Sequence, residues 1–218
     1  MSETTIPATS NVGDGDDTPH VSVVSSIERF VGRITTMRTD RLRFPDGTES
    51  DRDVVIHPGA VAIVALDDSD CIVLVRQFRQ PVGQMLEELP AGLLDVEGEA
   101  AFDAAKRELY EEAALRAADW HVLADLHSSP GMTNEAVRIF LARGLTEVGP
   151  DERHTPEHEE VAMTLRRVPL ARAVAAALSG ELTNASAVAG VLATAAAQTG
   201  GWTSLREPDV SWPARPGR

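Results

Sequence analysis

Two short apolar runs constrain the fold of this chain more than any other feature of its sequence. They cover residues 60–66 and 72–75, and the acidic segment 67–70 separates them. Each run has the length of a buried β-strand, and no run approaches the roughly 20 apolar residues that a membrane-spanning helix needs. The two runs and the polar turn between them therefore predict a hairpin of well-buried strands.

The segments after this hairpin predict helices packed on a mixed sheet. Residues 100–115 are rich in alanine, leucine, lysine and glutamate and contain no glycine or proline, which favours a helix. Strands followed by a helix, further strands and further helices indicate the α/β fold class. The later elements are expected as strands at residues 120–126, 137–142 and 161–168 and as helices at residues 169–179 and 184–198, the second capped by Asn184.

The 218 residues favour one domain with additional arms, since a domain takes roughly 150 residues. Residues 1–20 are polar and are expected to be a disordered tail. Residues 21–55 have the pattern of short strands, with a strong turn signal at residues 44–47. The main domain is expected at residues 56–205. Residues 206–218 carry three prolines and are expected to form a loosely ordered C-terminal tail.

The charge balance excludes several classes of partner. The formal net charge is −14, so binding to nucleic acid or to an anionic membrane is not expected, because both need a basic surface. The single cysteine, Cys71, excludes an intrachain disulfide and a cysteine-based zinc cluster. The first twenty residues have neither the basic region nor the apolar region that a secretory signal contains. We therefore expect a cytoplasmic protein. A protein this acidic needs cations at its site if its substrate is phosphorylated.

A cluster of glutamates carries the chemistry that the sequence suggests. Glu108, Glu111 and Glu112 have i, i+3, i+4 spacing and project from one face of the predicted helix. Such a cluster is often a solvated acidic face. Here, however, it follows the segment Pro90-Ala91-Gly92, whose small residues let backbone carbonyls approach a ligand. Carboxylates with a carbonyl and water form the oxygen shell that Mg²⁺ or Mn²⁺ prefers, and such ions bind phosphates and activate water.

This segment resembles the signature of the Nudix hydrolase family. The signature is Gly, five residues, Glu, seven residues and Arg-Glu-U-x-Glu-Glu-x-Gly-U, where U is bulky and aliphatic. Residues 107–115 match its second half, and seven residues separate Glu99 from Arg107. The chain departs from it twice, because six residues separate Gly92 from Glu99 and Ala114 replaces the glycine. The alanine costs about 1 kcal/mol if the backbone there needs a positive φ, and neither departure touches a metal-ligand position.

Within that family, residues 25–200 resemble bacterial ADP-ribose pyrophosphatases of the dimeric kind. The resemblance implies a Nudix-type α/β/α sandwich with a mixed sheet, preceded by a β-rich arm at residues 21–55 that exchanges across a homodimer. It also implies hydrolysis of a small-molecule nucleotide sugar, ADP-ribose to AMP and ribose 5-phosphate, with Mg²⁺ or Mn²⁺. The segments that carry it are residues 52–55, 57–64, 76–79, 88–95 and 129–131.

The resemblance also implies roles for the box residues. Glu108, Glu111 and Glu112 would be metal ligands, with the carbonyl of Ala91 completing the shell. Arg107 would pair with a box carboxylate and orient it, which is compatible with an ordinary i, i+4 pair to Glu111. Arg107 and Glu111 are therefore also expected to be catalytic residues. Glu99, at the helix start, is expected to be more structural than catalytic.

The general base is expected in the acidic loop at residues 150–160, by similarity to ADP-ribose pyrophosphatases. Alignment on the following strand gives Glu160 as the base, with Glu159 as the alternative. The loop also has the composition of a solvated acidic loop. A carboxylate suits the task, because a metal ion makes the attacking water acidic enough for a weak base.

Four residues are expected to bind the substrate. Arg52 and Arg79 would reach diphosphate oxygens or adenine-side groups, although each also fits a surface arginine. Met132 would touch the terminal ribose or pack in the core, and Glu88 lies in a matching segment. Glu87 stands where related enzymes often carry an aromatic residue, which leaves base specificity open. A GDP- or UDP-linked sugar is an alternative substrate. A non-catalytic nucleotide sensor is the alternative function, although the three box glutamates favour activity.

Overall fold

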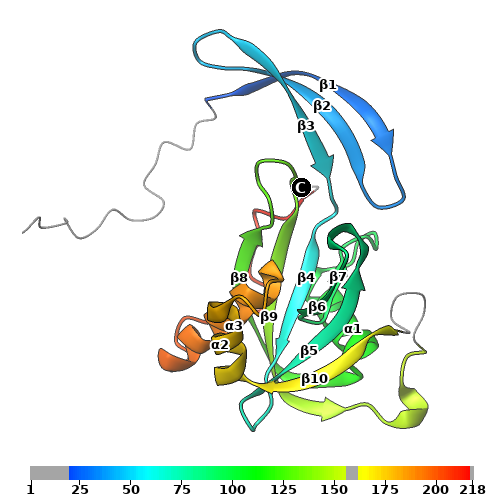
Figure 1. Cartoon of the computed structure of the whole chain (residues 1–218), viewed down its shortest axis with the longest axis vertical. Helices are drawn as coiled ribbons and strands as arrows, with labels where there is room; N and C mark the ends of the chain where they lie inside the picture. Colours follow the sequence, from blue (N-terminus) through cyan, green and yellow to red (C-terminus); the bar gives the residue numbers. More distant parts are fainter. Residues whose placement is uncertain (1–19, 156–161, 217–218) are drawn as a thin grey trace, which may run out of the picture.

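Two β-sheets and three α-helices form the body of the molecule, and a separate sheet projects from it (Figure 1). The structure is a computed structural model that describes residues 20–155 and 162–216. The central sheet has the strand order β7-β4-β9-β8, in which β4 runs parallel to β9 and antiparallel to β7, so the sheet is mixed as expected. The second body sheet has the order β10-β5-β6. The strands are β4 (Ala60–Ala65), β5 (Cys71–Arg79), β6 (Gln84–Glu88), β7 (Ala91–Leu93), β8 (Leu115–His127), β9 (Ala136–Glu147) and β10 (Thr164–Pro169).

The two apolar runs form the buried strands β4 and β5, but the predicted hairpin between them is wrong. A single bridge, Leu66 to Ile72, joins the runs, and β4 and β5 belong to different sheets. Along one edge β4 pairs with β9, on the other its first three residues pair with β7, and β5 pairs with β6 and β10. The acidic connection still forms a tight turn, because the Asp67 carboxylate accepts hydrogen bonds from the amides of Ser69 and Cys71.

Helices cover both faces of the central sheet, which confirms the expected α/β/α sandwich. The helices are α1 (Ala101–Ala113), α2 (Leu170–Ser179) and α3 (Ala185–Thr199). Alternate residues of β4 point to opposite faces, as the pleat of a strand requires. Val61 and Ile63 pack in the core with α1, whereas Ala62 and Val64 pack in the core with α2 and α3.

The sequence located the elements of the body well. The predicted helices correspond to α1, α2 and α3, and the side chain of Asn184 caps α3 by accepting a hydrogen bond from the Ala187 amide at 3.0 Å. The predicted strands at 120–126 and 137–142 are parts of β8 and β9, which are longer. The third predicted strand is β10, and residue 161 lies outside the described residues.

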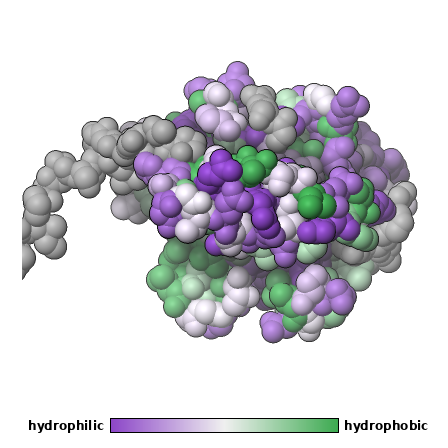
Figure 2. All heavy atoms as spheres, turned by 90° about the horizontal axis from the view of Figure 1, so that it is seen from above, coloured by the Kyte–Doolittle hydropathy of each residue, from purple (hydrophilic) through white to green (hydrophobic). Residues whose placement is uncertain are grey.

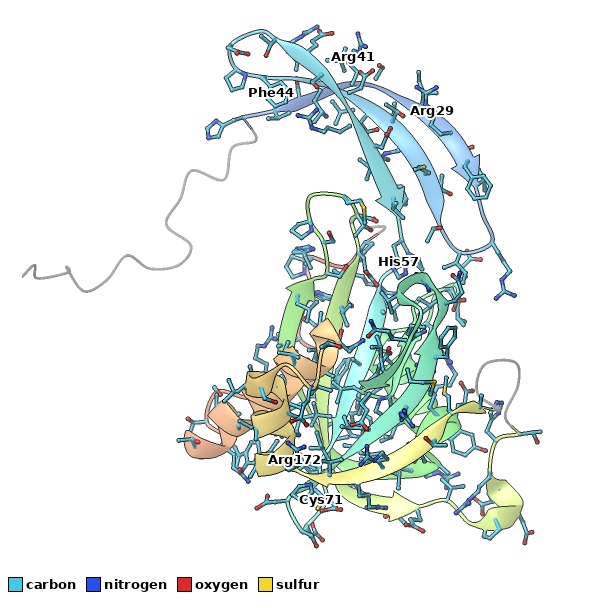
Figure 3. All side chains as sticks on the ribbon, viewed as in Figure 1. Arg29, Arg41, Phe44, His57, Cys71 and Arg172 are labelled. Carbon is cyan, nitrogen blue, oxygen red and sulfur yellow. The ribbon has the colours of Figure 1, made fainter. Side chains whose placement is uncertain are left out.

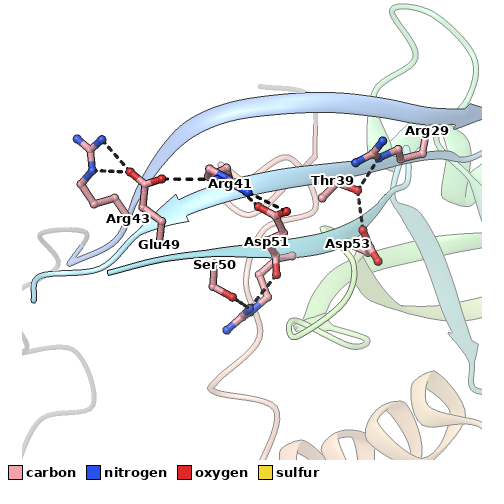
Figure 4. A network of polar contacts seen from close by, with 9 residues as sticks. Arg29, Thr39, Arg41, Arg43, Glu49, Ser50, Asp51 and Asp53 are labelled. Atoms are coloured by element: carbon pink, nitrogen blue, oxygen red, sulfur yellow. Dashed lines mark hydrogen bonds and ion pairs between the residues drawn. The ribbon is translucent and has the colours of Figure 1, made fainter. Parts of the chain in front are cut away.

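The N-terminal arm is a three-stranded sheet of β1 (Ser22–Val31), β2 (Thr36–Arg43) and β3 (Glu49–Ile56). Figure 4 shows polar contacts between its strands, such as the ion pair of Arg41 with Asp51. Figure 2, which looks onto this end of the molecule, shows hydrophobic residues among the polar ones. The large apolar side chains exposed on the arm include Val23, Val24, Ile27, Phe30 and Val31.

The C-terminal segment differs from the loosely ordered tail that was expected. Arg206 forms a β-bridge with Val122 of β8, and Trp212 is 4% exposed within the core that also contains α1. The expectation rested on three prolines and overlooked the tryptophan, whose large apolar surface stabilises the segment against the body. The disordered tail was expected at residues 1–20, of which residues 1–19 lie outside the described residues.

In the part of the chain that the structure describes, no helix is both long enough and apolar enough to span a membrane.

Candidate active site

Arg107 of α1 joins three carboxylates of the predicted site. Its Nε and Nη2 atoms donate to the two oxygens of Glu99, each at 3.0 Å. Its Nη1 atom donates to Glu108 Oε1 at 2.6 Å and to Glu111 Oε2 at 2.9 Å. The hydrogen bond with Glu99 is the largest of the causes that raise the pKa of Arg107, so its charge is permanent. The predicted orienting role of Arg107 is consistent with this geometry.

Glu108 is the most buried of the three box glutamates, with 8% of its surface exposed. Burial raises the pKa of its carboxyl group, although the charge and hydrogen bond of Arg107 oppose that effect. Gly92 of β7 makes room for this side chain, because a Cβ atom at Gly92 would lie 1.9 Å from Glu108 Oε1. The glycine of the signature is therefore needed for the close approach of α1 to β7.

Glu112 lies one helical turn after Glu108 and faces the same strand. Its Oε2 atom accepts a hydrogen bond from the backbone amide of Ala91 at 2.9 Å. Ala91 and Gly92 pair with Ala62 and Val61 of β4, so the central sheet fixes the position of this backbone. The structure thus brings Glu112 to the amide of Ala91 and Glu108 to the backbone of Gly92, and the metal-ligand roles expected for Ala91, Glu108, Glu111 and Glu112 stay predictions.

These residues fit a divalent cation by the chemistry of their donors. The carboxylates of Glu108 and Glu112, one helical turn apart on α1, supply the oxygen donors that suit Mg²⁺ or Mn²⁺. Among the described residues, no three acidic, histidine or cysteine side chains already converge on one point where a metal ion could sit.

The helix ends at Ala114, in the conformation that its signature glycine would favour. Ala114 has φ 51° and ψ 41°, and its amide donates to the carbonyls of Leu109 and Tyr110. The left-handed conformation carries the steric cost expected for alanine at this position. The departure from the signature therefore strains the helix end and leaves the carboxylates in place.

A cavity of about 200 Å³ adjoins the end of α1. Its lining includes Arg153 and His154, which precede residues 156–161 in the sequence, and Met163 and Leu165, which follow them. The hydroxyl of Tyr110 donates to the carbonyl of Glu152, which ties the start of this loop to α1. The predicted base Glu160 and its alternative Glu159 lie outside the described residues. The cavity is also lined by Glu111, Glu112, Ala113 and Ala114.

Arg79 and Glu88, two predicted substrate residues, form a pair at the ends of β5 and β6. Arg79 donates to both oxygens of Glu88, at 2.9 and 2.7 Å. Glu88 is 3% exposed, and the amide of the buried Gln77 lies 3.4 Å from it. Sequence reasoning missed Gln77, although its place in an apolar strand was a signal. The buried carboxylate orients the guanidinium, whose side chain is 41% exposed.

Arg52 and Met132 lie at the arm. Arg52 is exposed on β3 and donates to the hydroxyl of Ser50 and the carbonyl of Asp51. Met132 is 55% exposed in the loop between β8 and β9, and its carbonyl accepts a hydrogen bond from the Val55 amide. Among the described residues, no hydrogen bond or ion pair joins either of them to the glutamates of α1. Their predicted roles therefore remain predictions.

Comparison with known proteins agrees with this geometry. The family model described as "NUDIX domain" matches residues 56–185. The ADP-ribose pyrophosphatase of Mycobacterium tuberculosis is 48% identical over 193 residues, which cover 88% of this chain and 91% of that protein. The ADP-ribose pyrophosphatase of Bacillus subtilis is 37% identical over 61% of this chain and 70% of its own length. A crystal structure described as an ADP compounds hydrolase superposes with a TM-score of 0.72 at 23% identity, covering 83% of this chain and 95% of that one, and shows the shared fold.

Proposed function

Because the chain belongs to the Nudix family, we propose that it is a metal-dependent hydrolase that converts ADP-ribose to AMP and ribose 5-phosphate. The observation that carries the proposal is the cluster of Glu108, Glu111 and Glu112 on α1, in which Arg107 holds Glu108 and Glu111 and the Ala91 amide holds Glu112. The similarity to an ADP-ribose pyrophosphatase over nearly the whole of both chains supports the substrate.

Glu108 and Glu112, with Glu111 and the carbonyl of Ala91, would hold the divalent ions, Mg²⁺ or Mn²⁺. Bound ions of this kind neutralise the charge of a diphosphate and make an attacking water more acidic. Arg107 would orient the carboxylates of Glu108 and Glu111 through its hydrogen bonds to one oxygen of each. The raised pKa of the buried Glu108 agrees with this role, because a nearby cation would offset the cost of its burial.

Glu160 is the proposed general base, and Glu159 is its alternative. The base would take a proton from the attacking water as the water oxygen bonds to one phosphorus, and the P–O bond to the other phosphate would break. The leaving phosphate would keep the electron pair of that bond. Support comes from the described ends of the loop, because His154 and Met163 line the cavity beside Glu111 and Glu112.

Arg79 is proposed to bind the diphosphate. Glu88, which also accepts a hydrogen bond from Gln77, holds the guanidinium of Arg79, and such preorientation lowers the entropy lost on binding. Glu88 would then act on the substrate through Arg79.

Turnover of a nucleotide panel tests this function. We expect ADP-ribose with Mg²⁺ or Mn²⁺ to give AMP and ribose 5-phosphate, identified by mass, faster than GDP- or UDP-linked sugars. Faster turnover of another nucleotide sugar would show that the proposed substrate is wrong and that the proposed class of enzyme is right. Tight binding of ADP-ribose that stays intact after hours with metal would support the nucleotide sensor and overturn the proposal.

We also propose that the arm pairs with a second copy of the chain. Its exposed apolar side chains, such as Ile27, Phe30 and Val31, are 53 to 64% accessible. An apolar surface of this kind in a soluble enzyme indicates a protein interface. In such a dimer, Arg52 of the arm would act at the site of the other copy.

A further inference from the structure

The C-terminal segment is anchored in the body by Trp212 and Arg138. The guanidinium of Arg138 lies 4.9 Å from the centre of the Trp212 ring. Arg138 also donates to the carbonyls of Val210 and Ser211, at 2.7 and 3.2 Å, and to both oxygens of Asp125. Trp212 and the neighbouring Ala214 pack in the same core as α1. The segment is thereby held next to the start of the catalytic helix.

Past this anchor, the segment contacts one end of the loop that connects β7 to α1, residues 94–100, directly, and it reaches the other end through Gly59. At the far end of the loop, Arg215 Nη2 donates to the carbonyl of Glu99 at 3.0 Å. At the near end, Pro216 packs closely against Gly59. A Cβ atom added at Gly59 would lie only 3.0 Å from Pro216 Cδ. The carbonyl of Gly59 in turn accepts a hydrogen bond from the amide of Leu94 at 3.0 Å.

The position of Glu99 matters because its carboxylate is the two-oxygen partner of Arg107. Arg107 carries the contact on to Glu108 and Glu111. The start of α1 has little local support, since its N-cap residue is Ala100 and makes no side-chain capping hydrogen bond. A shift of Glu99 would therefore move Arg107 and change the orientation of the glutamates.

We propose that Arg215 is a positioning residue that holds the loop 94–100 and, through Glu99 and Arg107, orders the carboxylates of the active site. This inference rests on the proposed function for its catalytic consequence. Its structural part, the restraint of the loop by the C-terminal segment, does not depend on which substrate is cleaved.

The test compares Arg215→Ala with Arg215→Lys and Arg172→Ala in the full chain. Arg172 is a matched control, because it is an exposed arginine that pairs with Glu181 on the body. Figure 3 shows it at the opposite end of the body from His57, which lies where the arm meets the body. Amide hydrogen exchange of the metal-free protein measures the restraint of the loop directly. Steady-state kinetics at several Mn²⁺ concentrations measure the effect on the active site.

We expect Arg215→Ala to speed amide exchange in residues 94–107 by about tenfold, as expected for the loss of a local restraint. Its kcat should fall and its half-saturating Mn²⁺ concentration should rise, each by about tenfold, with KM for ADP-ribose little changed. Arg215→Lys should recover part of each effect, and Arg172→Ala should match the wild type.

Exchange in residues 94–107 that is the same in Arg215→Ala and in the wild type would overturn the inference. Equal changes in kcat and in Mn²⁺ dependence for Arg215→Ala and Arg172→Ala would also overturn it. If the wild type does not cleave ADP-ribose, the proposed function fails, and the exchange experiment still decides whether Arg215 restrains the loop.

Discussion

Arg107 allows three carboxylates to lie close together in the protein. Its side chain is hydrogen-bonded to Glu99, Glu108 and Glu111, and like charges at this spacing would otherwise repel one another. Glu112 uses a backbone amide as its partner instead. The residues of the site thus differ in their partners, and variants at single positions should separate their roles.

Glu112→Gln and Glu160→Gln should differ in their effect on metal binding. We expect Glu112→Gln to weaken Mn²⁺ affinity and lower kcat by at least about 100-fold, because a ligand is lost. Glu160→Gln should lose rate with Mn²⁺ affinity little changed, because a base acts on water and does not hold the ion. Calorimetric Mn²⁺ titrations beside initial rates measure both. Mild and equal effects of the two variants would show that the roles are assigned wrongly.

Asp125 should make stability depend on pH. Burial alone would raise its pKa, but hydrogen bonds from Arg138 and Arg206 hold the pKa below its ordinary value. A lowered folded-state pKa adds stability above the unfolded-state pKa, about 3.9, and this stability is lost as the pH falls through the folded-state value. We expect Asp125→Asn to lower the free energy of unfolding by about 2 kcal/mol at neutral pH, because it removes the carboxylate that pairs with the buried Arg138.

Urea unfolding at several pH values measures this effect. The difference between Asp125→Asn and the wild type should shrink as the pH falls below about 4. Asp103→Asn is the control, because Asp103 pairs with Lys106 at an exposed site and should contribute little. A difference that stays constant from neutral pH to acid would contradict the assignment.

At the scale of elements, the end of α1 is strained at Ala114. Because Ala114 has φ 51°, Ala114→Gly should raise the free energy of unfolding by about 1 kcal/mol, which thermal unfolding detects as a rise of about 2–4 °C. Ala113→Gly is the matched control one residue earlier. It should destabilise the protein by about 1 kcal/mol or more, because Ala113 is helical and buried. If Ala114→Gly destabilised the protein as Ala113→Gly does, the backbone at Ala114 would not be strained.

The elements could be predicted from the sequence because their signals are local. Helix α3 needs only its alanine-rich segment and the cap at Asn184, and both lie within a few residues of each other. The partner of β4 could not be predicted in this way. Its edges are taken by β7 and β9, and β9 begins more than 70 residues later in the chain, at Ala136. The sequence distance between Arg215 and Glu99 similarly hid their contact.

The site was predictable to the same extent. The box residues lie within one helix, so their spacing predicted that Glu108 and Glu112 share a face, and the structure brings both to β7. The cluster of Gln77, Arg79 and Glu88 depends on the pairing of β5 with β6, which no local pattern specified.

At the scale of the whole molecule, the arm extends away from α1, with Arg52 on its third strand (Figure 1). If the arm serves a second copy, Arg52→Ala and Glu112→Gln should each be inactive alone and should complement each other after subunit exchange. A mixed dimer would then hold one site with both changes and one site with neither. We expect about a quarter of wild-type activity from random reassortment of equal amounts.

The control is a mixture of Glu108→Gln with Glu112→Gln. Both residues belong to the site of their own protomer, so every site in the mixture carries one of the two changes and should stay inactive. Recovery in neither mixture, with dimers present by light scattering, would place Arg52 outside the site of the other copy. A monomeric wild-type protein would contradict the exchange altogether.

We propose that the carboxylates of α1 bind divalent cations for the cleavage of a diphosphate. A Mn²⁺ titration followed by electron paramagnetic resonance, with a non-hydrolysable ADP-ribose analogue present, tests it most directly. The account predicts that the wild type binds Mn²⁺ to saturation and that Glu112→Gln loses most of this binding while keeping its fold. If the wild type binds no Mn²⁺ at saturating concentration, or if Glu112→Gln binds it as tightly, the account is wrong.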